Sequence, residues 1–220
     1  AVQACLAGTL FQRPLRVLCL GAHCDDLEIG CGGAVNWLMR RYSSVEVHWV
    51  VFSAADARRR EEAMASAQAL LADAQTTTLI MKDFQDTFLP YDGRQVKESF
   101  CEIGDLCEPD VVFTHCQHDL HQDHRLIHEL TWNTFRNHLI LEYEIPKYDG
   151  DLGRPNVFVP LDGQAVEQKL EHLWTHFPTQ RTKPWFTKET FRGLLRLRGV
   201  ESAAPEGYAE AFHCRKICLK

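Results

Sequence analysis

The sequence predicts an α/β fold of the Rossmann-like, doubly wound kind: a mostly parallel sheet flanked by helices, with the functional site at the carboxyl ends of the strands. Short apolar runs of strand length alternate with longer stretches that are rich in helix-forming residues. The first run, LRVLCLGA at 15–22, is apolar apart from Arg16, which is typical of a parallel strand covered on both faces. Loops rich in histidine and aspartate follow two of the predicted strands, where ligands bind in such sheets.

The elements of this pattern follow one another in a regular order. After the first strand, the segment GCGG is expected to supply a permissive turn before a helix over 34–42. Strands and helices then alternate, because runs of β-branched residues are separated by stretches of strong helix formers. Strands are predicted over 45–54, 76–81, 109–115 and 139–145, and helices over 55–74, 94–107 and 124–138. Alternation at this spacing indicates right-handed βαβ crossovers.

The C-terminal third gives weaker signals. A turn-rich break, YDGDLGRPN, precedes a short strand over 158–162 and a helix over 163–176. The final run, 208–219, is expected to form an edge strand. Since no linker or internal repeat divides the chain, we expect one domain over 1–220, with a flexible N-terminal segment over 1–13.

Composition excludes several classes of partner. A formal net charge of −6 disfavours binding to nucleic acid or to an anionic membrane. No apolar run approaches the roughly 20 residues of a membrane span. The nine cysteines include no CxxC pair, and Cys19 and Cys218 lie in apolar runs, as buried free thiols do. We therefore expect a cytoplasmic protein, while homo-oligomer formation stays open.

The loop after the first strand places His23 beside two adjacent acids, Asp25 and Asp26. Neighbouring carboxylates repel each other unless a cation neutralises them. Consecutive side chains of an extended loop point in different directions, so one acid can bind a metal while the other faces a substrate. An aspartate-rich helix cap is the alternative interpretation.

The loop after the strand at 109–115 is unusually rich in histidine. Five of the eleven histidines fall within residues 115–128, together with two aspartates. Imidazoles and carboxylates gathered at a strand end provide the ligands that a first-row metal requires. A solvated polar loop is the alternative.

These two loops resemble signatures of the LmbE-like, or PIG-L-like, family of zinc-dependent N-acetylglucosamine deacetylases. The family's AHPDD stands here as AHCDD at 22–26, and its HPDH stands as HQDH at 121–124. Arg59 and Glu62 resemble its RxxE segment, and YAEAF at 208–212 resembles its C-terminal motif. Cys24 and Gln122 replace two prolines of the family pattern, and the Cys24 thiolate is a competing candidate for zinc.

The resemblance implies a removal of the acetyl group from an N-acetylated amino sugar, with Zn²⁺ as the cofactor. It implies that the metal ligands are His23, Asp26 and His124. It also implies that Asp25 is the general base, that His121 stabilises the oxyanion and that Asp123 orients His121. Arg59 would bind the substrate. The assignment makes chemical sense, because three protein ligands leave zinc a position for water. A protonated His121 would then be a charge-assisted donor to the oxyanion.

Several alternatives stay open at this point. An amidase acting on a sugar-thiol conjugate would use the same residues, and a non-catalytic zinc protein would use only the ligands. A nucleotide-binding Rossmann-like protein is disfavoured, because Val35 stands at the last glycine position of GxGxxG. Iron could replace zinc at such ligands. His128 is expected to support the site or pack, and Asp119, His115 and His118 to order their loop.

Overall fold

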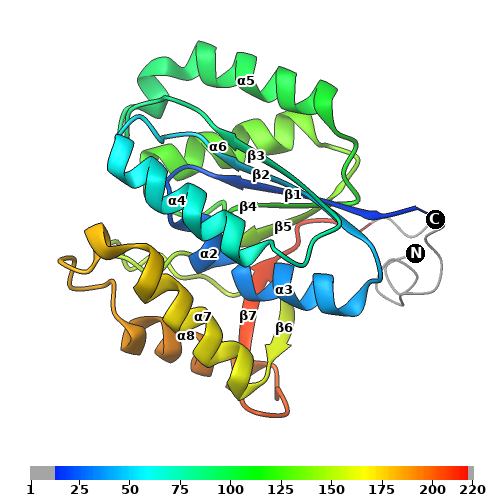
Figure 1. Ribbon diagram of the computed structural model, residues 1–220, viewed down its shortest axis with the longest axis vertical. Coiled ribbons are helices and arrows are strands. Elements are labelled where there is room, and N and C mark those ends of the chain that lie inside the picture. The colour runs from blue at the N-terminus through cyan, green and yellow to red at the C-terminus, as the bar shows by residue number, and fades with distance from the viewer. Residues whose placement is uncertain (1–12, 218–220) are drawn as a thin grey trace.

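The computed structural model describes residues 13–217 as one seven-stranded sheet with helices on both faces (Figure 1). The expectations for the segment before residue 13 and for Cys218 lie outside these residues. The strand order is β3-β2-β1-β4-β5-β7-β6. Five strands are parallel: β1 Leu15–Gly21, β2 Val45–Val51, β3 Thr76–Met81, β4 Val111–His115 and β5 Leu139–Tyr143. The predicted doubly wound, mostly parallel sheet is therefore confirmed.

Helices cover the sheet in two layers, each with its own apolar core. On one face, α5 Gly93–Leu106 and α6 Gln122–Thr134 pack over one set of strand side chains. The other face is covered by α2, α3, α4, α7 and α8, which span Asp26–Gly30, Gly32–Arg41, Ala57–Leu70, Gly163–His176 and Lys188–Glu201. Strand β1 is apolar apart from Arg16 because both of its faces are covered: Leu18 faces the α5 side, whereas Val17 faces the other core.

The C-terminal strands correct one prediction. Strand β7, Tyr208–His213, is antiparallel and lies between β5 and β6, Val157–Leu161, so it is an internal strand. Its side chains Ala209 to Phe212 are all buried, which fits a strand with neighbours on both sides. The edge is formed by β6 instead. Helix α8 and the short 3-10 helices η1 Leu89–Asp92 and η2 Pro178–Gln180 add to the predicted elements.

The glycine-rich segment serves close packing rather than an unusual turn. A Cβ on Gly30 would lie 2.2 Å from the ring of Tyr143, and one on Gly33 would lie 2.7 Å from Glu210 Oε1. Among the described glycines, only Gly150 and Gly207 adopt a positive φ. The expected permissive turn therefore does not explain the glycines at 30–33. They are needed because they leave room for neighbouring side chains.

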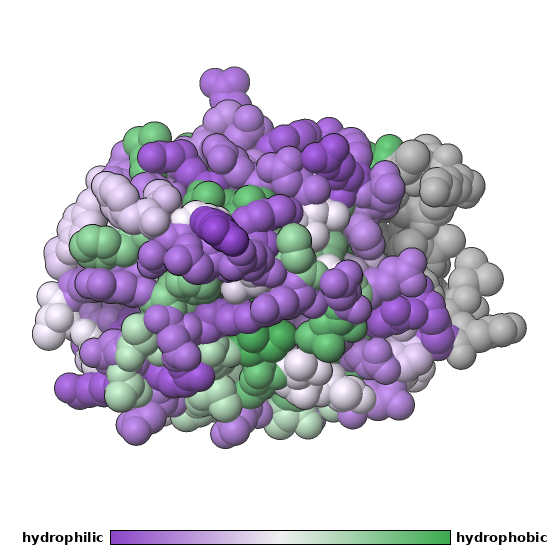
Figure 2. All heavy atoms as spheres, turned by 90° about the horizontal axis from the view of Figure 1, so that it is seen from above, coloured by the Kyte–Doolittle hydropathy of each residue, from purple (hydrophilic) through white to green (hydrophobic). Residues whose placement is uncertain are grey.

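The surface on the α5 side is mostly hydrophilic, with apolar side chains in small patches (Figure 2). No helix within residues 13–217 is both long and apolar enough to cross a bilayer. The feature that matters most for function is the pairing of β1 with β4. Because these parallel strands are neighbours, the loops that leave their carboxyl ends meet at one edge of the sheet.

Candidate metal centre

Two helix starts present the predicted site residues. Strand β1 ends at Gly21, and Asp25 is the N-cap residue of α2, which begins at Asp26. Strand β4 ends at His115, and His121 is the N-cap of α6, where its Nδ1 accepts the backbone N–H of Asp123 at 3.2 Å. Each loop thus turns sharply into a helix, which fixes the directions of its polar side chains.

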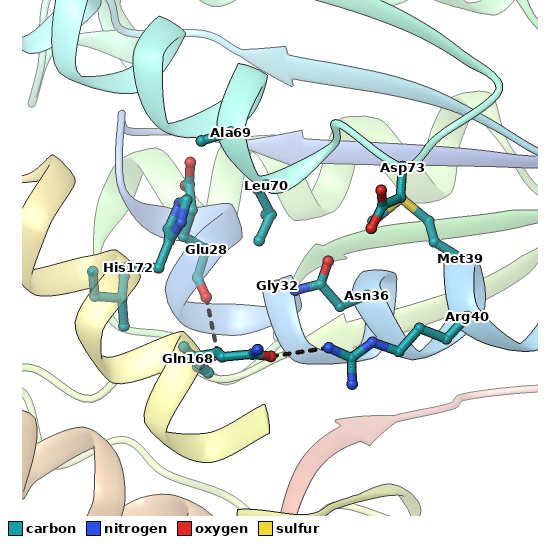
Figure 3. Close-up of a pocket in the computed structure, with 12 residues that line it drawn as sticks. Glu28, Gly32, Asn36, Met39, Arg40, Ala69, Leu70, Asp73, Gln168 and His172 are labelled. Atoms are coloured by element: carbon teal, nitrogen blue, oxygen red, sulfur yellow. Dashed lines mark hydrogen bonds between the residues drawn. The ribbon is translucent and has the colours of Figure 1, made fainter. Parts of the chain in front are cut away.

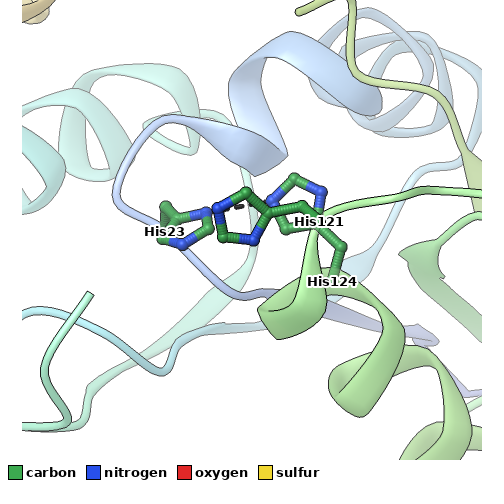
Figure 4. Close-up of side chains that lie close together, drawn as sticks. All are labelled: His23, His121 and His124. Carbon is green, nitrogen blue, oxygen red and sulfur yellow. Dashed lines mark hydrogen bonds between the residues drawn. The ribbon is translucent and has the colours of Figure 1, made fainter. Parts of the chain in front are cut away.

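Three of these side chains converge on one point. His23 Nδ1 lies 3.0 Å from His124 Nε2 and 3.2 Å from Asp26 Oδ2, and the latter two atoms are 3.5 Å apart. All three residues are buried. Ligand atoms that are bound to a tetrahedral zinc at about 2.1 Å lie roughly 3.4 Å from one another. The triangle therefore fits a metal ion of this kind, and Figure 4 shows the imidazoles of His23, His121 and His124 turned toward one another.

The charge states of two of the three predicted ligands suit metal binding. Burial opposes ionisation of Asp26, but the neighbouring imidazoles outweigh it and hold the pKa of this carboxyl well below its usual value. Burial, reinforced by His115, lowers the pKa of His124 to about 3. Metal ligands must be deprotonated, and both groups are in that form at neutral pH. For the third, His23, burial opposes a charged ring, but the charge of Asp26 and the nearby carboxylates outweigh it and raise the pKa of His23 well above its usual value, so a metal would have to displace its proton.

A second layer of residues holds the ligands from behind. Asp119 Oδ2 lies 2.8 Å from His124 Nδ1 and 3.0 Å from Lys147 Nζ. His115 Nε2 lies 3.2 Å from Asp26 Oδ2, and His128 Nδ1 donates to the His115 carbonyl oxygen at 2.9 Å. Asp119, His115 and His128 thus support the site without belonging to the triangle. His118 is exposed and lies outside this layer.

Sequence reasoning missed one acid of the site. Asp86 Oδ1 lies 2.9 Å from His23 Nε2. Asp86 lies beyond the carboxyl end of β3, just as His23 lies beyond that of β1. Its position after a parallel strand was the sequence signal that could have placed it near the site. Lys147, Lys183 and Tyr148 also line the site, and they come from segments with no recognisable signature.

The predicted substrate-facing residues share a cavity of about 200 Å³ with the metal ligands. Arg59 Nη2 donates to Asp25 Oδ1 at 2.6 Å, whereas its Nη1 is buried without a partner among the described residues. His121 lines the same cavity, and so does Trp185. The structure therefore brings the predicted base, the oxyanion residue and the arginine together.

The pairing predicted between Asp123 and His121 takes a different form. The Asp123 carboxylate faces His23, with Oδ2 3.2 Å from Nε2, and accepts the Thr87 N–H at 2.8 Å. It is the backbone of Asp123 that holds the ring of His121. Because His121 Nδ1 accepts the Asp123 N–H, it carries no hydrogen, so the ring is neutral, and burial lowers the pKa of His121 in the same sense. The geometric reason is that the first turn of α6 directs the carboxylate away from the N-cap side chain.

Cys24 does not compete for the metal. Its thiol donates to the Ser53 carbonyl oxygen at 3.6 Å, and burial raises its pKa to about 12. A buried thiol with this pKa is not a thiolate at neutral pH, and thiolate is the form that binds zinc.

A second cavity of about 220 Å³ lies on the other side of α2, between α3, α4 and α7 (Figure 3). Its wall includes Glu28 and His172, and the Ser66 hydroxyl lies between them, donating to Glu28 and 2.8 Å from His172 Nε2. None of the seven predicted site residues lines this cavity. The predicted site residues therefore lie at the first cavity and not at the second.

Comparisons with known proteins agree with this architecture. The fold matches N,N'-diacetylchitobiose deacetylase from Pyrococcus horikoshii with a TM-score of 0.70 and 24% identity, covering 93% of this chain and 85% of that one. It matches a hydratase, GalB from Pseudomonas putida, with a TM-score of 0.68 and 18% identity over 94% and 98% of the two chains. A deacetylase of teicoplanin biosynthesis matches with a TM-score of 0.67 and 16% identity over 91% and 97%.

Sequence comparison identifies the family. No curated protein matches the chain. The family model PIG-L, described as GlcNAc-PI de-N-acetylase, matches residues 18–135. That match contains both metal-site loops and extends over more than half of the 220 residues. The chain therefore belongs to the PIG-L family.

Proposed function

We propose that this chain is a zinc-dependent hydrolase that removes the acetyl group from an N-acetylated amino sugar. The observation that carries the proposal is the triangle of His23 Nδ1, Asp26 Oδ2 and His124 Nε2, which opens into a cavity shared with Asp25 and His121. The family description and the two deacetylases of the same fold support the reaction type. The hydratase of the same fold shows that the fold alone does not decide it.

The three ligand residues would hold zinc through one atom each. When bound, zinc supplies Lewis-acid polarisation of the amide carbonyl and lowers the pKa of water. Asp25 acts as the general base and acid. Arg59 fixes its Oδ1, which leaves Oδ2 to take a proton from the attacking water and to return it to the leaving amine.

His121 provides a donor for the oxyanion that develops during attack. Its Nδ1 accepts the Asp123 backbone N–H, so Nε2 carries the ring hydrogen. A neutral imidazole held in this orientation stabilises negative charge through Nε2–H. This role differs from the charged donor expected from the sequence and follows directly from the N-cap geometry.

The substrate would be a small molecule or glycan that carries an N-acetyl group. Arg59 Nη1 is a buried donor without a partner among the described residues, so a sugar hydroxyl or a phosphate oxygen would satisfy it. Trp185 and Tyr148 stand edge to face at 6.5 Å on the far wall of the cavity and offer aromatic surface to a sugar ring.

The experiment is metal analysis of anaerobically purified protein, combined with product analysis on N-acetylhexosamine compounds. We expect one zinc per chain and release of acetate from a simple N-acetylglucosaminide. Cleavage of a larger sugar-thiol amide without acetate release would replace the proposal by the amidase alternative. Iron in place of zinc would change the identity of the proposed metal. Bound metal without any hydrolysis would overturn the proposed enzyme.

A further inference from the structure

His23 is engaged on both sides of its ring. Its Nδ1 belongs to the ligand triangle, whereas its Nε2 faces two carboxylates on the opposite side. Asp86 Oδ1 lies 2.9 Å from Nε2, and Asp123 Oδ2 lies 3.2 Å from it. An imidazole that binds metal through one nitrogen carries its hydrogen on the other, so Nε2–H would point at these oxygens.

The turn that carries Asp86 has an unusual backbone. Thr87 has a φ of 70°, in the left-handed region that β-branched residues rarely adopt. The strain costs on the order of 1–2 kcal/mol and persists only where surrounding contacts impose it. Here the Thr87 N–H donates to Asp123 Oδ2 at 2.8 Å, and its carbonyl oxygen accepts Gln122 Nε2 at 3.0 Å. The turn is thus tied to the loop that carries His124.

Asp86 keeps its contact with His23 although it has access to solvent. Its side chain is 60% exposed, so burial does not force it into this position. An exposed carboxylate would otherwise be free to turn toward solvent.

We infer that Asp86 is a positioning residue for His23, held against the ring by the left-handed turn at Thr87. The inference rests on the proposed metal site. Carboxylates that accept the second N–H of a metal-binding imidazole fix its orientation and raise its basicity. Asp86 fills this role better than Asp123, because it lies closer to Nε2 and because Asp123 Oδ2 already accepts the Thr87 N–H.

The test is zinc affinity, measured by competition with a chelator on the full chain. Asp86→Ala should weaken zinc binding about 10- to 100-fold, the loss typical of such partners. Asp86→Asn should lose less, because its amide oxygen still accepts Nε2–H. Thr87→Gly should stay within about 2-fold of the unaltered chain, because glycine adopts a φ near 70° without strain.

Asp83→Ala is the matched control. Asp83 lies three residues earlier, its side chain is 79% exposed, and it pairs with Arg60 rather than with His23. It should keep its zinc affinity. Thermal unfolding of the metal-free proteins should be the same for all of these chains except Thr87→Gly, because Asp86 is exposed.

The outcomes separate the two proposals. An Asp86→Ala chain that binds zinc as tightly as the unaltered chain would overturn the inference and leave the metal site standing. Equal losses in Asp83→Ala and Asp86→Ala would also overturn it, since net charge alone would then explain them. An unaltered chain that binds no zinc would overturn both proposals.

Discussion

The parallel half of the sheet and the C-terminal third contribute to the site in different ways. Strands β1 and β4 present the ligand loops directly, and β3 presents Asp86. The C-terminal third provides a buried ion pair behind those loops: Lys169 of α7 and Glu210 of β7. The first region thus holds the predicted metal ligands and catalytic residues, whereas the second supports their loops through this ion pair and adds Lys183 and Trp185 to the cavity wall.

The ion pair joins two short helices of the site. Lys169 Nζ donates to the carbonyl oxygens of Glu28 at 2.9 Å and Ile29 at 2.6 Å, at the end of α2. Glu210 accepts the N–H groups of Gly33 at 2.8 Å and Ala34 at 2.7 Å, at the start of α3. Cations suit a helix C-terminus and anions an N-terminus. The pair therefore secures both ends of the turn that follows Asp26.

We expect that a substitution of a catalytic residue in the loops after β1 and β4 lowers activity strongly without unfolding the protein. Asp25→Ala should lower turnover about 10²- to 10⁴-fold, because the proton acceptor is lost. Zinc content should stay close to that of the unaltered chain, since Asp25 is not in the ligand triangle. Thermal stability should fall without unfolding the protein, because Arg59 loses its partner. Steady-state kinetics and metal analysis check this. Loss of zinc together with activity would show that Asp25 is a ligand.

A change in the buried ion pair behind the loops should instead lower the stability of the fold. Lys169→Met should destabilise the fold by about 3–5 kcal/mol, because it leaves the Glu210 carboxylate buried and unpaired. Combining it with Glu210→Gln should recover part of the loss. Urea unfolding of the metal-free protein measures both.

The control is Lys188→Met, which removes the cation of a more exposed pair with Glu171 on the same face. It should change stability by less than about 0.5 kcal/mol. Similar losses for Lys169→Met and Lys188→Met would contradict a special role for the buried pair.

Acid should lower the stability of the fold through His172 of α7, in the C-terminal region. Burial, together with repulsion from His176, lowers the pKa of His172 from 6.5 to about 4. Between those values the unfolded chain binds a proton that the folded chain does not, so stability falls as pH falls through this window. After allowance for partial exposure, the loss is about 1–2 kcal/mol.

His172→Gln should remove this part of the pH dependence, since its amide still reaches Ser66 but does not titrate. Urea unfolding at about pH 7 and about pH 4.5 compares the two chains. The same loss of stability in both would show that other groups cause the acid sensitivity.

The two regions also differ in how far the sequence predicts them. The alternation of strands and helices identified β1 to β5, and the polar loops after β1 and β4 contain six of the seven predicted site residues. The seventh, Arg59, lies on α4. Helix α8 was missed because Leu197 and Val200 are exposed, which blurs the apolar face formed by Phe191 and Leu195. The place of β7 was wrong because strand pairing between distant segments leaves no local signal.

Site details that depend on distant contacts were equally hidden. The sequence places Asp123 beside His121, but the helix start turns its carboxylate toward His23. The place of Asp86 beyond the carboxyl end of β3 hints at the site, but nothing in DFQDTF names His23 as its partner, because the two residues are far apart along the chain. Local pattern thus predicts which residue types gather at the edge of the sheet, and tertiary packing decides their partners.

The most direct test of the metal site is the zinc content of His124→Ala beside that of His118→Ala. Both histidines belong to the loop after β4, but only His124 has a nitrogen in the ligand triangle, and His118 is exposed. We expect one zinc per chain for the unaltered protein and for His118→Ala, and none for His124→Ala. Stoichiometric zinc in His124→Ala would contradict it.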